Sequence, residues 1–371
     1  MATAPVPAGG RVATLALLLP LLMSPGCASR NPHFDPAKPH HTSTGFRNSD
    51  GSAIDKSFAD LVRWRWHAWR NDLPPAPASP QGAWPFAWTT PDHAMLARGA
   101  RAAAPGEASP ITVTWIGHAT VLLQVAGKTI LTDPHFGDRA SPVSFIGPKR
   151  RMPLPATLDE LPRIDLVVIS HDHYDHLDAP TIRRLVAQAG GEPVFAVPLG
   201  NERLLAELGA RRIVALDWWE RRSIEGLEIG CLPVHHWSAR GLGDRNENLW
   251  SGWRIAADGF SFVFVGDTGY SADFAEIGRR AGPFDLAAIP IGAYEPRWFM
   301  KAQHVNPSEA VQILRDLRAR SAMAIHWGTF ELTDEPLDRP LVDLAAALAA
   351  DDADARRFEV YRHGETRTIR R

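Results

Sequence analysis

The sequence has little cysteine, little net charge and no long apolar run. Only two cysteines, Cys27 and Cys231, occur in 371 residues, so we expect Cys27 to form no internal disulfide. The formal net charge of −2 gives no sign of a nucleic-acid-binding surface, and no nucleic acid partner is expected. No internal repeat is visible, and 45% hydrophobic with 22% charged residues is typical of a globular protein.

The amino end contains a short apolar segment, Val12–Met23, which follows Arg11. It is too short for a comfortable transmembrane helix and fits the apolar region of a secretory signal peptide. Ser24-Pro25-Gly26-Cys27 then resembles a bacterial lipobox, although leucine is usual where Ser24 stands. We therefore expect residues 1–27 to be a signal peptide and the protein to be lipid-anchored through Cys27 in the cell envelope, facing the periplasm. Cleaved soluble export and an uncleaved anchor are the alternatives.

Residues 28–108 are expected to form an N-terminal arm. Ala28–Ile54 is polar without apolar periodicity, which indicates a tether or irregular arm. Ser57–Asn71 predicts a helix, and the proline-rich Leu73–Pro91 ends it. Six residues recur at helical spacing: Phe58, Leu61, Val62, Arg65, Trp66 and Trp69. We expect this helix to pack on the main domain, and contact with a lipid interface is the alternative.

Residues 109–371 are expected to form one α/β domain. Strands are predicted at Ile111–Ile116, Val121–Val125, Thr129–Thr132, Leu166–Ile169, Val194–Val197, Ile213–Leu216, Leu227–Val234, Trp253–Ala256, Phe260–Val265, Leu286–Ile289, Ala322–Ile325 and Phe358–Arg362. Helices are predicted at Ala179–Ala189, Ser271–Arg280, Asn306–Arg318 and Leu341–Ala349. Strands that first follow one another and then alternate with helices favour sheets covered by helices.

One loop carries four metal-ligand side chains. His171, His173, Asp175 and His176 directly follow the apolar run Ile164–Ile169, which is predicted as a buried strand. Imidazole and carboxylate together suit zinc, and manganese or iron can occupy such sites. The tight loop can direct His171 and His173 to one metal and Asp175 and His176 to a neighbour. The motif therefore suggests a two-metal hydrolytic centre.

Further ligand types follow three later strands. His235-His236 comes after Leu227–Val234, Asp267 after Phe260–Val265, and His326 after Ala322–Ile325. Strand ends that face one way are where sheet proteins build their sites.

These segments are similar to the metallo-β-lactamase fold, an αββα sandwich of two mixed sheets covered by helices. More narrowly, the sequence resembles the N-acylphosphatidylethanolamine-hydrolysing phospholipase D branch, and its bacterial envelope-type members in particular. The stretches that carry this resemblance, besides the His171 motif, are Trp115–Val121, Asp133-Pro134, Gly266–Tyr270, Tyr294–Met300, His304–Ala310 and Ala324–Phe330.

The resemblance implies two zinc ions per chain. His171, His173 and His235 would hold one ion, with His236 as the alternative to His235. Asp175, His176 and His326 would hold the other, and Asp267 would bridge the two. The identity of the metal in the cell stays open.

Other residues are assigned more loosely. His118, Asp133 and Asp178 are expected to orient ligands or to serve in turns. The resemblance places His304 near the scissile phosphate, where it would bind an oxygen or protonate the leaving group; flanking a helix is the alternative. Tyr294 and Arg297, with Glu295, would line the substrate path or pack the domain. Cys231 is expected to be an apolar core thiol.

The implied reaction is hydrolysis of a phosphodiester by a hydroxide between the two metals. Asp175 or Asp267 would steer the hydroxide, and N-acylphosphatidylethanolamine would yield an N-acylethanolamine and phosphatidate. A related hydrolase of another ester (a lactonase, phosphotriesterase or nucleotide phosphodiesterase) is the second hypothesis. A lipid-anchored envelope protein that binds metal or lipid without catalysis is the third. The sequence does not decide whether the chain forms a homodimer.

The lipobox hypothesis predicts that cells expressing the chain incorporate a radioactive fatty acid into it, and that Cys27→Ala abolishes this labelling because the acceptor thiol is lost. Equal labelling of both proteins would contradict lipid attachment at Cys27.

Overall fold

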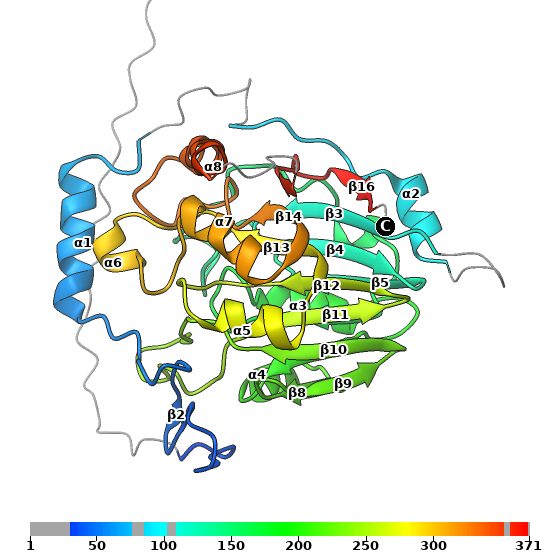
Figure 1. Cartoon of the computed structure of the whole chain (residues 1–371), viewed down its shortest axis with the longest axis horizontal. Helices are drawn as coiled ribbons and strands as arrows, with labels where there is room; N and C mark the ends of the chain where they lie inside the picture. Colours follow the sequence, from blue (N-terminus) through cyan, green and yellow to red (C-terminus); the bar gives the residue numbers. More distant parts are fainter. Residues whose placement is uncertain (1–29, 76–84, 102–108, 352–356, 370–371) are drawn as a thin grey trace, which may run out of the picture.

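Two seven-stranded sheets face one another, and helices cover their outer faces in a computed structural model of the chain (Figure 1). The structure describes residues 30–75, 85–101, 109–351 and 357–369. The predicted signal peptide and Cys27 lie outside these residues. Among the described residues, no helix is long and apolar enough to cross a membrane.

The first sheet has the order β16-β3-β4-β5-β6-β7-β8. Its strands are β3 (Thr112–Gly117), β4 (Thr120–Val125), β5 (Lys128–Thr132), β6 (Leu166–Val168), β7 (Val194–Pro198), β8 (Ile213–Leu216) and β16 (Thr366–Thr368). The pairs from β16 to β5 are antiparallel, and those from β5 to β8 are parallel. Parallel neighbours need a crossover. Helix α3 (Ala179–Val186) lies between β6 and β7 and α4 (Asn201–Glu207) between β7 and β8, while residues 133–165 connect β5 to β6.

The second sheet has the order β15-β14-β13-β12-β11-β10-β9. Its strands are β9 (Arg221–Ile224), β10 (Leu227–Leu232), β11 (Gly252–Ala257), β12 (Phe260–Phe264), β13 (Phe284–Pro290), β14 (Ala319–Ile325) and β15 (Phe358–Glu359). Its parallel half, β12 to β15, uses α5 (Asp273–Arg280), α7 (Pro307–Asp316) and α8 (Arg339–Ala350) as connections. Two short helices, α2 (His93–Gly99) and α6 (Arg297–Met300), lie outside this alternation.

The core lies on both faces of the first sheet. Trp115 joins Trp253 and Phe262 of the second sheet in one fully buried cluster. Leu122 and Phe195 point the other way, into a cluster with Ile182 of α3. Burial on both faces is typical of the parallel part of a sheet in an α/β protein. The predicted α/β sandwich of two mixed sheets covered by helices is confirmed.

The N-terminal arm packs on the main body. Its hairpin of β1 (His41–Thr42) and β2 (Gly45–Phe46) lies beside Asp217, whose side chain is 1% exposed. The Asp217 carboxylate accepts hydrogen bonds from Lys38 Nζ at 2.5 Å, His40 Nε2 at 2.7 Å and His41 Nε2 at 3.0 Å. Of the two alternatives predicted for Ala28–Ile54, a tether or an irregular arm, residues 30–54 form an irregular arm. Composition missed this contact because the arm docks through polar groups rather than an apolar face.

Helix α1 (Phe58–Arg70) forms as predicted and begins with a capping box between Ser57 and Asp60. It packs on the main body through Trp64, which stacks on Phe299 at 4.8 Å and donates from Nε1 to Asp334 Oδ1 at 2.9 Å. Packing on the main domain is confirmed, but the buried residues of the helix are Trp64 and Ala68. The periodic stripe named above faces outward.

Asp217→Ala should lower the free energy of unfolding by roughly 3 kcal/mol, because it leaves three donors without their shared buried acceptor. Urea unfolding measures this change. Asp159→Ala is the matched control: Asp159 pairs with Arg184 but its side chain is 89% exposed, so its loss should change little. Equal effects of the two substitutions would show that the arm contact contributes no more than a surface ion pair.

Candidate metal centre

Five segments bring acidic and imidazole side chains to one edge of the sandwich. His118 lies in the β3–β4 turn, and the His171–His176 loop follows β6. His236 follows β10, Asp267 follows β12, and His326 follows β14. Because strands from both sheets end here, their polar residues converge between the two layers.

The first cluster consists of three imidazoles. His171 Nε2 lies 2.8 Å from His173 Nδ1, and His236 Nε2 lies 3.3 Å from the same atom. One nitrogen from each ring falls within 4.8 Å of the others, which is close enough for one metal ion. His171 and His236 are fully buried.

The second cluster surrounds Asp175. Its Oδ2 lies 3.0 Å from His118 Nε2 and 3.4 Å from both His176 Nε2 and His326 Nε2. These four residues also offer atoms within 4.8 Å of one another. His118 thus stands inside the cluster, although the sequence indicated only an orienting or turn residue.

Asp267 lies between the clusters. Its Oδ2 is 3.1 Å from His176 Nε2 and its Oδ1 is 3.1 Å from His326 Nε2, both in the second cluster. The same Oδ2 lies 3.9 Å from His236 Nε2 of the first cluster. This is the position that a bridging carboxylate needs.

The arrangement fits two divalent metal ions. Buried polar atoms normally have hydrogen-bond partners. Yet His176 Nε2, His326 Nε2 and Asp267 Oδ1 of the second cluster are buried with no hydrogen bond among the described residues. Nitrogen and carboxylate oxygen donors are those that zinc and its neighbours in the first transition row accept.

Asp133 orients one imidazole from behind. Its Oδ2 accepts from His176 Nδ1 at 2.6 Å, which leaves His176 Nε2 directed at the cluster. Ser170 holds Asp133 in turn through its backbone N–H at 2.7 Å and its hydroxyl at 2.5 Å. A carboxylate behind a ligand imidazole fixes its tautomer and raises its basicity.

Burial sets the charge of the first cluster. It lowers the pKa of His173 to about 4 and that of His236 to about 3, so both rings are neutral at pH 7. Neutral imidazole is the form that binds a metal. In the second cluster, burial lowers the pKa of His326, but Asp267 and Asp175 outweigh it and raise that pKa to about 9. Burial also opposes the charge of Asp267, yet His176 and His326 hold its pKa well below its usual range.

The structure brings His236, not the predicted His235, to the first cluster. The His235 backbone donates to Thr268 Oγ1 at 3.0 Å and accepts from Gly269 N–H at 2.8 Å. Successive side chains in extended backbone point to opposite sides. His235 therefore turns away, and its Nε2 lies 3.0 Å from Ser52 Oγ.

Asn48 of the N-terminal arm supports the first cluster, which sequence reasoning missed. Its Oδ1 accepts from the backbone N–H of His236 at 3.0 Å and from Trp250 Nε1 at 3.2 Å. The His236 ring is held from its other side by the Gln303 carbonyl, 2.9 Å from Nδ1. A lone asparagine in a polar arm gives no sequence signal for such a contact.

His304 lies beside the clusters and Tyr294 does not. His304 Nδ1 is buried without a hydrogen bond, 3.8 Å from Asp267 Oδ2. Tyr294 instead donates its hydroxyl to Asp343 of α8 at 2.6 Å. Arg297 donates to the His304 carbonyl at 2.9 Å and to both carboxylate oxygens of Glu309, at 3.0 and 2.7 Å. The structure thus gives Tyr294 and Arg297 packing and positioning contacts in place of a lining role.

Two further residues named from the sequence, Asp178 and Cys231, serve the fold and lie outside the metal-ligand clusters. Asp178 caps α3 and accepts from the Thr181 hydroxyl at 2.5 Å, so it orients no ligand imidazole. Cys231 is a free, fully buried thiol, as predicted.

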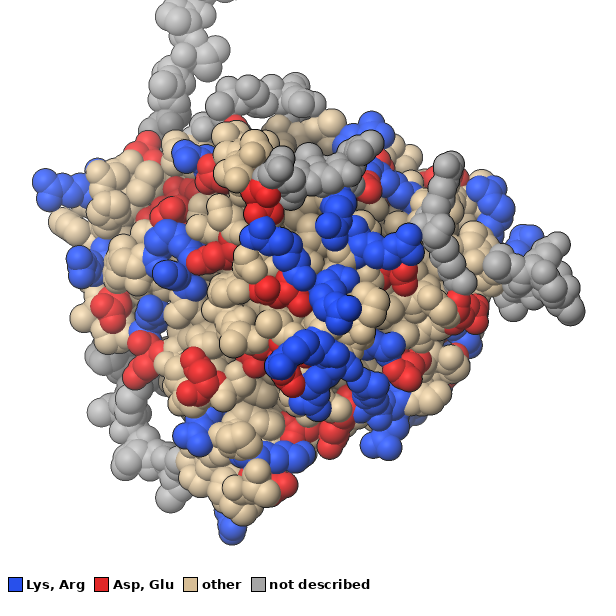
Figure 2. Space-filling view, viewed as in Figure 1, with Lys and Arg blue, Asp and Glu red and all other residues tan. Residues whose placement is uncertain are grey.

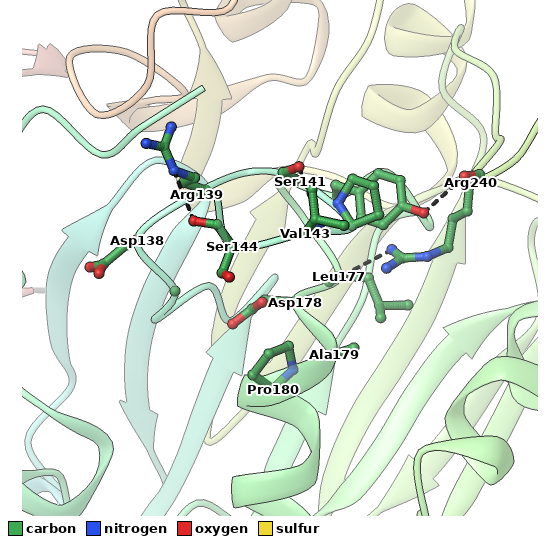
Figure 3. A pocket seen from close by; sticks show the side chains of 13 residues that line it. Asp138, Arg139, Ser141, Val143, Ser144, Leu177, Asp178, Ala179, Pro180 and Arg240 are labelled. Atoms are coloured by element: carbon green, nitrogen blue, oxygen red, sulfur yellow. Dashed lines mark hydrogen bonds between the residues drawn. The ribbon is translucent and has the colours of Figure 1, made fainter. Parts of the chain in front are cut away.

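A cavity of about 420 Å³ lies beside the metal-ligand loop (Figure 3). Tyr174, Leu177 and Asp178 form one wall, and Arg139 and Val143 belong to the facing segment. Tyr174 donates its hydroxyl to the Arg240 carbonyl at 2.9 Å, with the Arg240 guanidinium 3.9 Å from its ring centre. The loop thus directs His171, His173, Asp175 and His176 to the clusters, and Tyr174 and Leu177 to this cavity.

The sequence matches the family model described as a beta-lactamase superfamily domain over residues 128–327. It is 46% identical over 234 residues to N-acyl-phosphatidylethanolamine-hydrolyzing phospholipase D 1 of Caenorhabditis elegans, which covers 60% of this chain and 65% of that protein. It is 36% identical over 237 residues to the mitochondrial N-acyl-phosphatidylethanolamine-hydrolyzing phospholipase D of Saccharomyces cerevisiae, covering 62% of this chain and 50% of that protein. The match therefore spans less than two thirds of either relative.

The fold also occurs in solved structures. A metallo hydrolase from the archaeon Ignicoccus hospitalis superposes with a TM-score of 0.51 at 23% identity. The superposition covers 70% of this chain and 98% of that protein. At this identity, the likeness concerns the fold alone.

Asn48→Ala should weaken metal binding by the first cluster roughly tenfold, because the backbone of His236 loses a buried hydrogen bond. Competition with a chromogenic chelator measures the affinity of each bound ion. Ser52→Ala is the matched control from the same arm, since Ser52 contacts His235 and not His236. Unchanged affinity in Asn48→Ala, or an equal loss in both variants, would contradict this positioning role.

Proposed function

We infer that this chain, which belongs to the metallo-β-lactamase superfamily and to its N-acylphosphatidylethanolamine-hydrolysing phospholipase D-like branch, is a metal-dependent hydrolase of a phospholipid phosphodiester bond. The observation that carries this proposal is the pair of clusters joined by Asp267, whose carboxylate lies 3.1 Å from His176 and His326 and 3.9 Å from His236. Two adjacent sites with a shared carboxylate are the arrangement that two-metal hydrolysis requires.

We assign one zinc ion to each cluster, and manganese or iron is compatible with the same donors. The first would be held by His171, His173 and His236. The second would be held by Asp175, His176 and His326, with His118 against Asp175 and with Asp267 shared. When bound, the two ions would make a water nucleophilic at neutral pH and neutralise the charge of the attacked phosphoryl group.

Two residues of the chain would act on the substrate and its protons, and Arg297 would position one of them. Asp175 is the more accessible of the two central carboxylates, with its side chain 15% exposed against 2% for Asp267. It is therefore placed to orient the attacking water by accepting its hydrogen bond. Burial lowers the pKa of His304 to about 3, so its ring is neutral and can donate one hydrogen bond to a phosphate oxygen. Arg297 holds the His304 backbone in place.

N-acylphosphatidylethanolamine-like phospholipids are the proposed substrate. The support is the reaction for which the worm and yeast relatives are named, together with the segment from Tyr294 to Glu309. In this segment Arg297 donates hydrogen bonds to the His304 carbonyl and to Glu309 in α7. The residues that resemble the family here therefore hold His304 in place beside the metal sites. The products would be an N-acylethanolamine and a phosphatidate.

The cell envelope is the proposed location, with the protein anchored through a lipid on Cys27 and facing the periplasm. Its support is the lipobox-like Ser24-Pro25-Gly26-Cys27 after a short apolar segment. An anchor of this kind would hold the metal sites beside their lipid substrate.

Asp175→Ala should lower kcat for N-acylphosphatidylethanolamine and for a bis-aryl phosphodiester by roughly a thousandfold or more, because both ion binding and water orientation are lost. Release of N-acylethanolamine measures the first reaction. Tyr174→Phe is the matched control, since the Tyr174 hydroxyl faces Arg240 in the same loop. Its activity should be close to that of the wild type.

Full turnover by Asp175→Ala would contradict the mechanism. Preferred turnover of a lactone, a phosphotriester or a cyclic nucleotide over the lipid would support the proposed hydrolase activity but contradict the proposed phospholipid substrate.

A further inference from the structure

We propose that the outward face of α1, together with the basic cavity beside it, binds the surface of an anionic phospholipid bilayer. This inference rests on the proposed phospholipid substrate and assigns it a docking surface distinct from the metal centre. It is also separate from the predicted lipid anchor.

The apolar stripe of α1 is exposed along its whole length. Five of its side chains have large exposed fractions: Phe58 68%, Leu61 41%, Val62 49%, Trp66 60% and Trp69 66%. An amphipathic surface helix normally turns such a stripe toward the core. Here the helix is held by Trp64 and Ala68, which lie off the stripe. The geometry therefore keeps the apolar stripe available for another surface.

The charge on and around α1 favours an anionic partner. Helix α1 carries three arginines, Arg63, Arg65 and Arg70, against one carboxylate, Asp60; Lys56 precedes it, and Asp55 and Asp72 flank it. Blue, tan and some red surface lies along the side of the molecule that carries α1 (Figure 2). Trp298 of α6, 46% exposed, extends the aromatic surface and lies 4.8 Å from the Arg63 guanidinium.

A cavity of about 520 Å³ opens beside the helix and is also basic. Arg65 of α1 lines it together with Arg139, Lys149 and Arg151. Among the described residues that line it, the one carboxylate is that of Glu331, which pairs with Arg151 at 2.6 Å. Besides Arg65, the cavity therefore offers two further cations, Arg139 and Lys149, for a phosphate-bearing headgroup, next to side chains that suit the acyl boundary.

A bilayer fits this combination better than a second copy of the chain. Tryptophan and arginine on one helix are typical of interfacial helices, because their side chains have an apolar body and a polar end. Two copies meeting through this face would instead bring Arg65 of each chain into a positively charged interface.

A chain of contacts connects the outward face of α1 to the metal centre. Trp64 packs on Phe299 of α6, and the Met300 carbonyl accepts the His304 backbone N–H at 2.9 Å. A lipid surface at α1 would thus lie one short helix away from the residue beside Asp267. We assign α1 the task of setting the depth and orientation at which the centre meets the bilayer.

Vesicle binding tests the proposal on the full chain carrying Cys27→Ser, so that no lipid can be attached. Co-sedimentation with phosphatidylglycerol vesicles should show that Trp66→Ser with Trp69→Ser weakens binding roughly tenfold or more. The matched control is Val342→Ser on α8, where an equally apolar side chain is 61% exposed. It should bind as the parent does, and all three proteins should share one melting temperature.

A second variant tests the charge. Arg65→Glu with Lys149→Glu should reduce the preference for phosphatidylglycerol over phosphatidylcholine vesicles roughly tenfold. The residual preference should also depend less on salt. A preference that survives both charge reversals would overturn the role of the basic cavity.

Equal vesicle binding by the tryptophan variant and its parent would overturn the docking face. So would light scattering that shows a dimer dissociated by Trp66→Ser with Trp69→Ser, because the stripe would then serve a second copy. Hydrolysis of a soluble bis-aryl phosphodiester should be unchanged in these variants. If the Cys27→Ser protein did not hydrolyse this diester, the proposed function would be contradicted. The vesicle-binding result would still show whether α1 binds the bilayer.

Discussion

The buried carboxylate of Asp267 is the group on which the centre depends. A carboxylate that is 3% exposed needs positive charge nearby, and two imidazoles whose pKa it raises, those of His176 and His326, lie 3.1 Å from it. The neutral rings of His236 and His304 lie at 3.9 and 3.8 Å. Because these rings come from loops of both sheets, a single side chain fixes how the ends of the two layers meet. The same position makes Asp267 the natural shared ligand of two cations. Asp267 thus has two roles: its buried charge holds imidazoles from both sheets together, and its carboxylate would be shared by the two metal ions.

The N-terminal arm is a second constraint on this centre. Asp217 holds the arm through Lys38, His40 and His41, and Asn48 farther along the arm holds His236. Helix α1 then continues to α6, which leads to His304. Residues outside the sandwich therefore reach both sides of the metal centre. This explains why a polar, irregular segment packs as tightly as it does.

Local patterns predicted most of the fold and every proposed metal ligand except His236. The His171–His176 loop, Asp267 and His326 follow apolar strands, so their convergence could be inferred from position alone. His236 could not be told from His235, because the phase of the alternation depends on the contact with Thr268 and Gly269. Periodicity predicts that the apolar stripe of α1 packs on the main domain. In the structure the stripe is exposed, and Trp64 and Ala68, which lie off the stripe, make that contact. Asn48 lies 188 residues from His236 and belongs to no pattern.

In the proposed centre two metal ions share Asp267, and His236 belongs to the first site. Metal content by inductively coupled plasma mass spectrometry, measured on the wild type, His236→Ala and His235→Ala after equal dialysis, tests this arrangement. We expect two ions per wild-type chain, about one in His236→Ala and two in His235→Ala. Loss of an ion from His235→Ala with two retained in His236→Ala, or a single ion in the wild type, would contradict this arrangement.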